Sequence, residues 1–228
     1  MELQDYLNTN FPGLVLKPSL YSQWNNRLHF ELAKGLYQMN NRTDELNQNY
    51  FNAVYNQALT LFNMIFSDED TMFLVTNIHQ TKQDTKKSIR KMKVYRHYIK
   101  NKTIRFQLRQ KTVSYLLDEE DYYFSSQFSL ECKKQDISYP LLIKAICNQD
   151  FSSLKPTIST PDYSYNPEVF FINVTKNVIF YIYDDRGCEI IATNKEIIRL
   201  IYKEYSDWID EDSRKEIDEQ FVITEEET

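Results

Sequence analysis

Two periods in the placement of apolar residues predict the elements of the first half of the chain. Residues 27–33 (RLHFELA) alternate between apolar and polar positions, which predicts a strand. From Thr43, taken as an N-cap, apolar residues recur every three or four positions as far as Ile65, and this spacing predicts a long buried helix. Residues 72–78 (MFLVTNI) predict a strand, and residues 83–99 a basic helix. Helices and strands are therefore mixed along the chain.

The middle of the chain is rich in strand-like runs. Residues 103–132 contain three of them, TIRFQL, TVSYLL and YYFSSQFSLEC, with an irregularity expected within the last. An apolar cluster predicts a helix at 138–148, and the Pro-containing stretch 152–167 predicts a loop. These runs extend the sheet that the first strands begin.

The last third carries the clearest pattern. The segments EVFFINV (168–174), VIFYIY (178–183) and CEIIA (188–192) are separated by turn residues and predict a three-stranded meander. Thr193 and Glu196 have the spacing of a capping box for a following helix that continues to Ile209. The chain is thus expected to be a single α+β domain over residues 1–222, with helices packed on a mixed or mainly antiparallel sheet. Residues 223–228 are expected to form an acidic, disordered tail.

Composition agrees with one well-packed domain and narrows its chemistry. With 42% hydrophobic and 14% aromatic residues, the chain can bury a sizeable core. Neither a signal peptide nor a membrane-spanning apolar run is present, so we expect a cytoplasmic protein without membrane contact. The odd, widely spaced cysteines, Cys132, Cys147 and Cys188, predict reduced and buried thiols.

Glycine is the most restrictive residue type. The three glycines, Gly13, Gly35 and Gly187, are isolated, whereas phosphate-binding loops of nucleotide-binding proteins need several close together. This excludes a Walker or Rossmann loop and also the nucleophile elbow of an α/β-hydrolase. No cofactor is expected.

The first candidate site is the turn at the end of the second meander strand. Asp184, Asp185, Arg186 and Gly187 place two carboxylates and a guanidinium together, which could bind a divalent cation or a phosphate. A purely structural turn explains the same residues, because aspartates bond their own backbone, Gly187 could supply a positive φ, and Arg186 could brace a carboxylate.

The second candidate is the polar face of the first strand. Arg27, His29 and Glu31 lie on one side of it and could offer a base and an anion-binding group if that side lined a cleft. An exposed edge strand has the same appearance. The chain has three histidines and no metal-binding histidine spacing, so we expect no metal site or nucleophilic triad.

The third candidate is a charge asymmetry. Residues 82–111 hold twelve Lys and Arg residues against one Asp, although the whole chain has a net charge of −6. The basic side chains Lys86, Lys87, Arg90, Lys91 and Arg96, interleaved with Tyr95 and Tyr98, could bind a nucleic-acid backbone and stack on its bases. The alternatives are pairing with the acidic C-terminal helix and tail, or binding a protein. Because the overall charge opposes polyanions, we do not expect nucleic acid as the partner.

Several segments carry a family resemblance. They are FPGLVL near the start, NRLHFELA at 26–33, KAICNQDF at 144–151 and YDDRG at 183–187. With them the chain resembles, over essentially its whole length, the bacterial family described as domain of unknown function 3885, seen mostly in Firmicutes. His29 stands where that family has an arginine, which puts any role of that arginine in doubt. The resemblance implies no activity.

The function expected from these observations is a non-catalytic protein-binding module. Its most concrete form is an immunity or antitoxin protein that covers a toxin-like partner with an acidic C-terminal surface, by analogy with the strand–turn–strand–helix topology of such proteins. One alternative is a metal-dependent hydrolase or phosphoryl-handling enzyme that uses the Asp-Asp-Arg turn together with Glu31. The other is nucleic-acid binding through residues 82–111. The sequence leaves the oligomeric state open.

Overall fold

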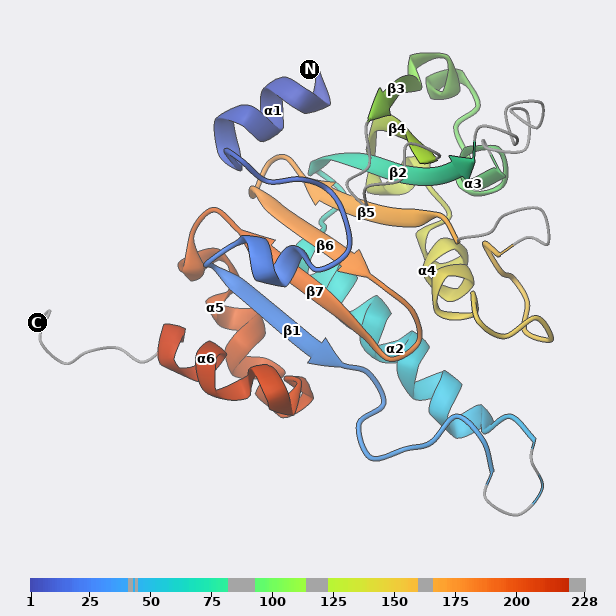
Figure 1. Ribbon diagram of the computed structural model, residues 1–228, viewed down its shortest axis with the longest axis vertical. Coiled ribbons are helices and arrows are strands. Elements are labelled where there is room, and N and C mark those ends of the chain that lie inside the picture. The colour runs from blue at the N-terminus through green and yellow to red at the C-terminus, as the bar shows by residue number, and fades with distance from the viewer. Residues whose placement is uncertain (41–42, 44, 82–92, 114–122, 160–165, 222–228) are drawn as a thin grey trace, which may run out of the picture.

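One antiparallel sheet organises the molecule. The computed structural model describes residues 1–40, 43, 45–81, 93–113, 123–159 and 166–221 (Figure 1). The seven strands of its sheet follow the order β1-β7-β6-β5-β2-β4-β3, and every neighbouring pair is antiparallel. The strands are β1 Arg27–Glu31, β2 Thr71–Thr81, β3 Arg109–Val113, β4 Tyr123–Lys133, β5 Glu168–Asn173, β6 Val178–Ile182 and β7 Gly187–Ala192.

Helices lie on both faces of this sheet. The α-helices are α1 Leu3–Asn10, α2 Gln48–Ile65, α3 Lys93–Tyr98, α4 Tyr139–Cys147, α5 Lys195–Glu204 and α6 Glu211–Phe221. Short 3-10 turns are η1 Leu20–Gln23, η3 Thr103–Gln107, η4 Lys134–Asp136 and η5 Ser206–Trp208. The predicted α+β class and the meander followed by a helix are confirmed, since β5, β6 and β7 are consecutive neighbours and α5 follows.

The larger core lies between the sheet and α2, α4 and α5, which cover its back face in Figure 1. α2 presents Phe51, Val54, Leu61 and Phe62 to the sheet, and each is fully buried, as the helical spacing of apolar residues requires. Phe62 packs edge-on against Phe171 of β5 with ring centroids 5.2 Å apart. Burying these side chains is the main source of the fold's stability.

A smaller core covers the front face. There α1 and the segment through η1 pack against β5, β6 and the middle of β2 (Figure 1). Its apolar patch is central, and the same face becomes polar toward both ends of the sheet. His29 and Glu189 lie directly opposite each other on β1 and β7, and Asn77 opposes Glu168 of β5 at the other end. The sites discussed below lie at these polar ends.

The C-terminal segment protects the edge of β1. Ile209 bridges to Phe30, and the backbone N–H of Asp210 donates to the carbonyl of His29 at 3.0 Å. The Gln220 side chain accepts from the N–H of Arg27 at 3.2 Å. Because an unpaired edge strand invites association, this cover keeps the sheet from extending on that side. The single helix predicted to reach Ile209 is instead α5, η5 and α6 in succession.

Several local predictions are wrong for identifiable reasons. Residues 103–107 form η3 rather than a strand, because the Arg105 guanidinium donates to the carbonyls of Arg96 and Ile99 and bends the segment back. β4 has no irregularity, since it pairs with β2 without interruption from Tyr123 to Lys133.

The predicted caps are also displaced. Asn47, rather than Thr43, caps α2 by accepting from the N–H of Asn49 at 3.1 Å. Asn194, rather than Thr193, caps α5 by accepting from the N–H of Glu196 at 2.9 Å. In both places asparagine bonds the N–H two residues ahead, which satisfies an otherwise unpaired donor.

The remaining predictions concern the cysteines, the less well-patterned segments and membrane-spanning helices. The three cysteines are free and buried, as predicted. Most of the predicted basic helix, part of the 152–167 loop and the acidic tail lie outside the described residues. Of the described helices, none combines the length and apolarity needed to cross a bilayer.

Gly187 has a packing role that differs from the predicted one. Its φ is not positive, and a Cβ at this position would overlap the Tyr183 hydroxyl and the Phe30 carbonyl. Gly35, in contrast, has a φ of +80° and open space around it. The hairpin therefore needs Gly187 for close approach of β7 to β1 and to the Tyr183 ring.

We expect Gly187→Ala to lower the free energy of unfolding by about 3 kcal/mol, because backbone and a ring must move to admit a methyl group. Gly35→Ala is the control and should cost about 1 kcal/mol, from backbone conformation alone. Urea unfolding followed by circular dichroism measures both. Equal losses in the two variants would contradict the packing role.

Candidate functional site

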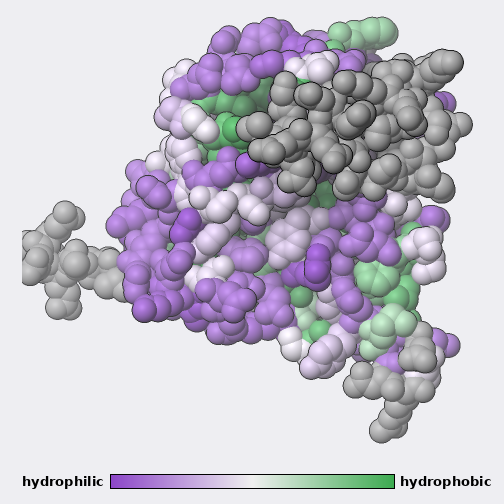
Figure 2. Space-filling view, in the orientation of Figure 1, coloured by the Kyte–Doolittle hydropathy of each residue, from purple (hydrophilic) through white to green (hydrophobic). Residues whose placement is uncertain are grey.

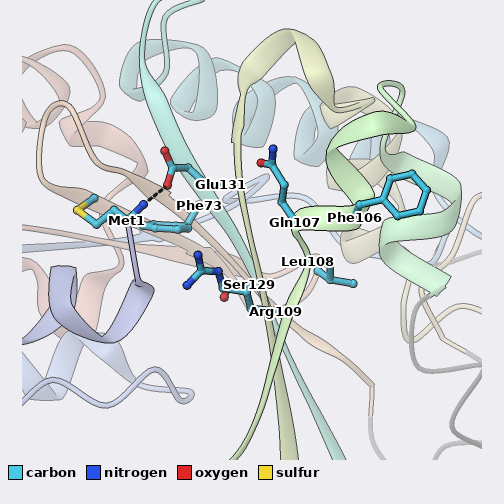
Figure 3. Close-up of a pocket in the computed structure, with 8 residues that line it drawn as sticks. All are labelled: Met1, Phe73, Phe106, Gln107, Leu108, Arg109, Ser129 and Glu131. Carbon is cyan, nitrogen blue, oxygen red and sulfur yellow. Dashed lines mark hydrogen bonds and ion pairs between the residues drawn. The ribbon is translucent and has the colours of Figure 1, made fainter.

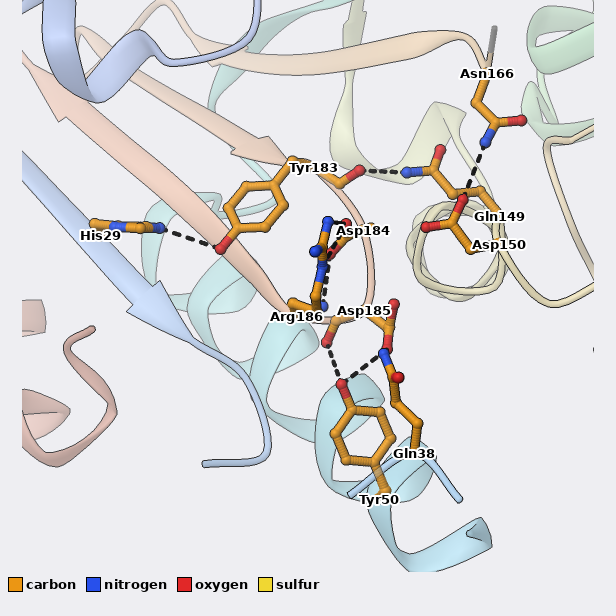
Figure 4. Close-up of polar contacts among 10 residues, drawn as sticks. All are labelled: His29, Gln38, Tyr50, Gln149, Asp150, Asn166, Tyr183, Asp184, Asp185 and Arg186. Carbon is orange, nitrogen blue, oxygen red and sulfur yellow. Dashed lines mark hydrogen bonds and ion pairs between the residues drawn. The ribbon is translucent and has the colours of Figure 1, made fainter. Parts of the chain in front are cut away.

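The β6–β7 turn, residues 183–187, is closed by its own side chains (Figure 4). The Asp184 carboxylate accepts from the backbone N–H of Arg186 at 2.7 Å and from its Nε at 2.9 Å. Asp184 is buried, whereas the Arg186 side chain is 68% exposed. The aspartate therefore forms the backbone turn and the arginine braces it, as the structural interpretation of the sequence proposed.

Asp185 points the other way and ties the turn to α2. Its Oδ2 accepts from Gln38 Nε2 at 2.6 Å and from the Tyr50 hydroxyl at 2.8 Å. The residue is 1% exposed, and burial raises the pKa of its carboxyl group while the two donors oppose that rise. Burial and the neighbouring Asp185 carboxylate also raise the pKa of Tyr50. Asp185 thus joins the turn, the β1–α2 loop and the first turns of α2.

A third carboxylate lies beside these two. One carboxylate oxygen from each of Asp150, Asp184 and Asp185 lies within 4.8 Å of the other two, a spacing compatible with a cation. Burial, and then the charges of the other two aspartates, raise the pKa of Asp150. A cation would have to compete with the Gln38, Tyr50 and Arg186 donors, so the geometry supports a structural cluster. Glu31, which the alternative enzyme interpretation placed with the turn carboxylates, is not part of this group.

His29 links the turn to α6. Its Nε2 lies 3.1 Å from the Tyr183 hydroxyl and its Nδ1 lies 3.0 Å from Ser213 Oγ, which donates to Asp210 Oδ1 at 3.2 Å. With the imidazole proton on Nδ1, the Tyr183 hydroxyl donates to Nε2 and Nδ1 donates to Ser213 Oγ. Because the Ser213 hydroxyl in turn donates to Asp210, every donor in this series has an acceptor. Burial lowers the pKa of His29, although Asp210 and Asp212 oppose this. Neutral His29 is therefore the form that the fold favours.

Of the other two residues of the predicted β1 face, Arg27 lies away from the turn, whereas Glu31 lies next to it. The Arg27 guanidinium pairs with Glu216 at 2.6 Å, donates to the carbonyl of Tyr21 at 2.8 Å and lies 4.1 Å from the Tyr21 ring centre. Glu31 is half-buried opposite Gly187 in the β1–β7 register. Arg27 therefore packs against η1 and α6.

The basic candidate surface is only partly within the described structure. Lys86, Lys87, Arg90 and Lys91 lie outside it, and Arg96 is exposed on α3. Tyr95 and Tyr98, expected to stack on bases, are 1% and 7% exposed because they belong to the larger core. That part of the nucleic-acid prediction is wrong.

The basic segment was alternatively expected to pair with the acidic C-terminal helix and tail, but its described residues pair with α1 and the residue before it. Arg109 forms an ion pair with Glu2, and Lys111 donates to Gln4 at 3.1 Å, so β3 contacts α1. No ion pair within the described residues joins it to the C-terminal helices.

A hollow of about 470 Å³ lies beside this contact (Figure 3). Its walls are Met1, Phe73, Phe106, Gln107, Leu108, Arg109, Ser129 and Glu131. The charged groups in it are already matched, because Glu131 pairs with the Met1 amine at 2.9 Å and Arg109 with Glu2. The hollow therefore offers no unmatched charge for a ligand.

A polar group at the opposite end of the front face was missed by sequence reasoning. His79 Nδ1 lies 2.7 Å from Ser125 Oγ, and its Nε2 lies 3.0 Å from Glu168 Oε1. The order hydroxyl, imidazole, carboxylate is that of a nucleophilic triad. Ser125 is 0% exposed, however, so no substrate carbonyl can reach its hydroxyl in this arrangement. Cross-strand pairing of β2 with β4 explains the contact.

Sequence reasoning also missed three members of the turn cluster. Gln38 and Tyr50 come from a loop and a helix far away in sequence, and no local pattern marks them as partners of Asp185. Asp150 had a signal, since it lies in the segment KAICNQDF that carries the family resemblance. Only the folded arrangement brings them together.

Asp185→Ala should lower the free energy of unfolding by about 2 kcal/mol, because it leaves the buried donors of Gln38 and Tyr50 without their carboxylate. Asp150→Ala removes a neighbouring but exposed carboxylate and should change stability by less than about 0.5 kcal/mol. Urea unfolding of both variants tests this. A smaller loss for Asp185→Ala than for Asp150→Ala would refute the structural role.

Protonation of His29 should weaken the fold on mild acidification. Its pKa lies below the ordinary value of 6.5, so the unfolded chain takes up this proton more readily and stability falls as pH decreases through that value. His29→Gln should therefore flatten the stability profile between pH 7.5 and about pH 5.5. His97→Gln, at an exposed histidine, is the control. An unchanged slope in His29→Gln would contradict the assignment.

Comparison with known proteins agrees with the family resemblance. The chain is 42% identical over 213 residues to the uncharacterised protein YnaE of Bacillus subtilis (strain 168), an alignment that covers 92% of this chain and 98% of YnaE. No solved structure matches this chain. The model of a family described as a domain of unknown function matches residues 3–213, which include β1 and the 183–187 turn. The chain therefore belongs to this bacterial family, DUF3885.

Proposed function

We propose that the protein is a non-catalytic binding module for a basic protein partner. The observation that carries this proposal is the charge of the C-terminal surface, formed by residues 195–221. Its exposed carboxylates are Glu196, Glu204, Asp207, Glu211, Asp212, Glu216 and Glu219, and its exposed ammonium groups are Lys203 and Lys215. With the half-buried groups included, residues 195–221 carry nine carboxylates against five Lys and Arg side chains, a net charge of −4. This negative charge attracts a basic surface and accelerates its association.

The C-terminal surface is held in place by the rest of the fold. Arg27 binds Glu216 and Lys34 binds Glu211, so two of its carboxylates anchor α6 to β1 and to the β1–α2 loop. Ile217 and Phe221 are buried on the opposite side of the same helix. A surface whose helix is fixed before binding loses little conformational entropy when a partner docks.

The turn cluster supports a binding role over catalysis. Asp184 and Asp185 are buried and accept from protein donors, and the exposed Arg186 is paired with Asp184. These groups build the scaffold on which the C-terminal surface rests, through the Tyr183–His29–Ser213 contacts. The specific form of the proposal is an immunity or antitoxin protein that covers a basic toxin. The topology of β6, β7 and α5 supports this form by analogy.

Reversing charge on the C-terminal surface tests the proposal. Asp212→Lys/Glu219→Lys changes two exposed side chains and should slow association with a partner about tenfold at low salt, with a smaller effect at high salt. The partner is captured from a lysate of the source bacterium, purified, and its binding measured by biolayer interferometry at two salt concentrations.

Asp68→Lys/Glu69→Lys makes the same change of charge at an exposed turn before β2 and is the matched control. It should leave the association rate within a factor of about two of the wild type. If both double variants lost binding equally, or if the captured partner were acidic, the proposed surface would be wrong.

A further inference from the structure

The β1–α2 loop, residues 33–40, exposes apolar side chains and turns a polar one inward. Leu36, Tyr37 and Met39 are 43%, 72% and 42% exposed. Between them, Gln38 directs its amide into the protein, where it donates to Asp185 Oδ2 at 2.6 Å (Figure 4). Solvation alone favours the reverse, because amides are hydrated better than aromatic or aliphatic groups.

The loop is fixed at several points. The carbonyl of Tyr37 accepts from Asn47 Nδ2 at 2.9 Å, and the carbonyl of Gln38 accepts from the N–H of Asn47 at 2.8 Å. The N–H of Ala33 donates to Gln57 Oε1 at 2.6 Å. The apolar side chains are therefore displayed on an ordered backbone, which reduces the entropy that binding must remove.

The loop is continuous with the C-terminal surface. Lys34, at the start of the loop, forms an ion pair with Glu211 at the start of α6, where Asp212 is also exposed. On its other side lie Asp185 and, within the same carboxylate cluster, the exposed Asp150. Figure 2 shows apolar patches beside a hydrophilic surface at the lower right, the side where this loop leaves the body in Figure 1.

An apolar centre with a charged rim is the usual anatomy of a protein-binding surface. Tyrosine is enriched among the side chains that contribute most of the binding energy, and polar rims exclude water around them. Here Tyr37 is the most exposed of the loop's apolar side chains, and the carboxylates of α6 and Asp150 flank the loop.

We propose that the β1–α2 loop is the apolar anchor of the interface, with Leu36 and Tyr37 inserted into an apolar pocket on a basic protein. Asp185 then has a functional consequence, because its bond to Gln38 holds Tyr37 outward. The inference rests on the proposed function and adds the residues that dominate the contact and the chemistry of the complementary site.

A random 12-residue peptide display library, selected on the purified full-length protein, is the probe. Leu36→Ser/Tyr37→Ser keeps the backbone bonds of the loop and should reduce binding of the selected peptides at least tenfold. Phe106→Ser removes a 93% exposed aromatic ring at η3, which contacts β4 near the sheet edge opposite β1. It is the matched control and should leave binding unchanged. The selected peptides should combine Lys or Arg with aromatic or aliphatic residues.

The outcomes separate this inference from the proposed function. Peptides that are basic, lose binding with Asp212→Lys/Glu219→Lys, but ignore Leu36→Ser/Tyr37→Ser would overturn the loop inference and leave the acidic surface in place. Peptides that need the loop but are acidic would overturn both the basic chemistry and the proposed function. Equal losses in the loop variant and in Phe106→Ser would also overturn the inference, because they would indicate adhesion to any exposed aromatic group.

Discussion

The buried carboxylate of Asp185 is the interaction on which the arrangement of this protein's surface depends. Placing a carboxylate inside a protein is costly unless donors surround it, and here Gln38 and Tyr50 supply them from two other segments. The same pair of bonds therefore satisfies the charge and determines where the β1–α2 loop runs. The carboxylate of Asp185, at the end of the β6–β7 hairpin, thus turns Gln38 of the β1–α2 loop inward and leaves Tyr37 facing solvent.

Close packing at Gly187 gives this arrangement its geometry. Because β7 begins with a residue that has no side chain, β1 and the Tyr183 ring approach the hairpin closely, and the Tyr183 hydroxyl comes within hydrogen-bonding distance of His29. His29 then reaches Ser213 on α6. The turn consequently acts in two directions, holding the loop through Asp185 and the C-terminal helix through Tyr183.

The sequence predicts the parts of the fold that depend on local periodicity. The meander and α2 follow from alternation and helical spacing, since both patterns are imposed by burial on one or two faces. Predictions failed where a distant group decided the conformation, as at η3, where Arg105 bonds carbonyls of the preceding helix and turn. The candidate turn was found from its residue types, but its partners Gln38 and Tyr50 could not be, because their contact exists only across the folded sheet.

Burial distinguishes a catalytic from a binding interpretation of the candidate polar residues. A catalytic carboxylate must meet its substrate, whereas Asp184 and Asp185 are buried and face protein donors. The Ser125–His79–Glu168 group has the residue types of a triad but encloses its hydroxyl. The β1–α2 loop, in contrast, exposes Leu36, Tyr37 and Met39 on a hydrogen-bonded backbone, beside the ion pair of Lys34 with Glu211. A protein partner of the kind proposed above would bury these exposed apolar side chains, and that burial would favour its binding.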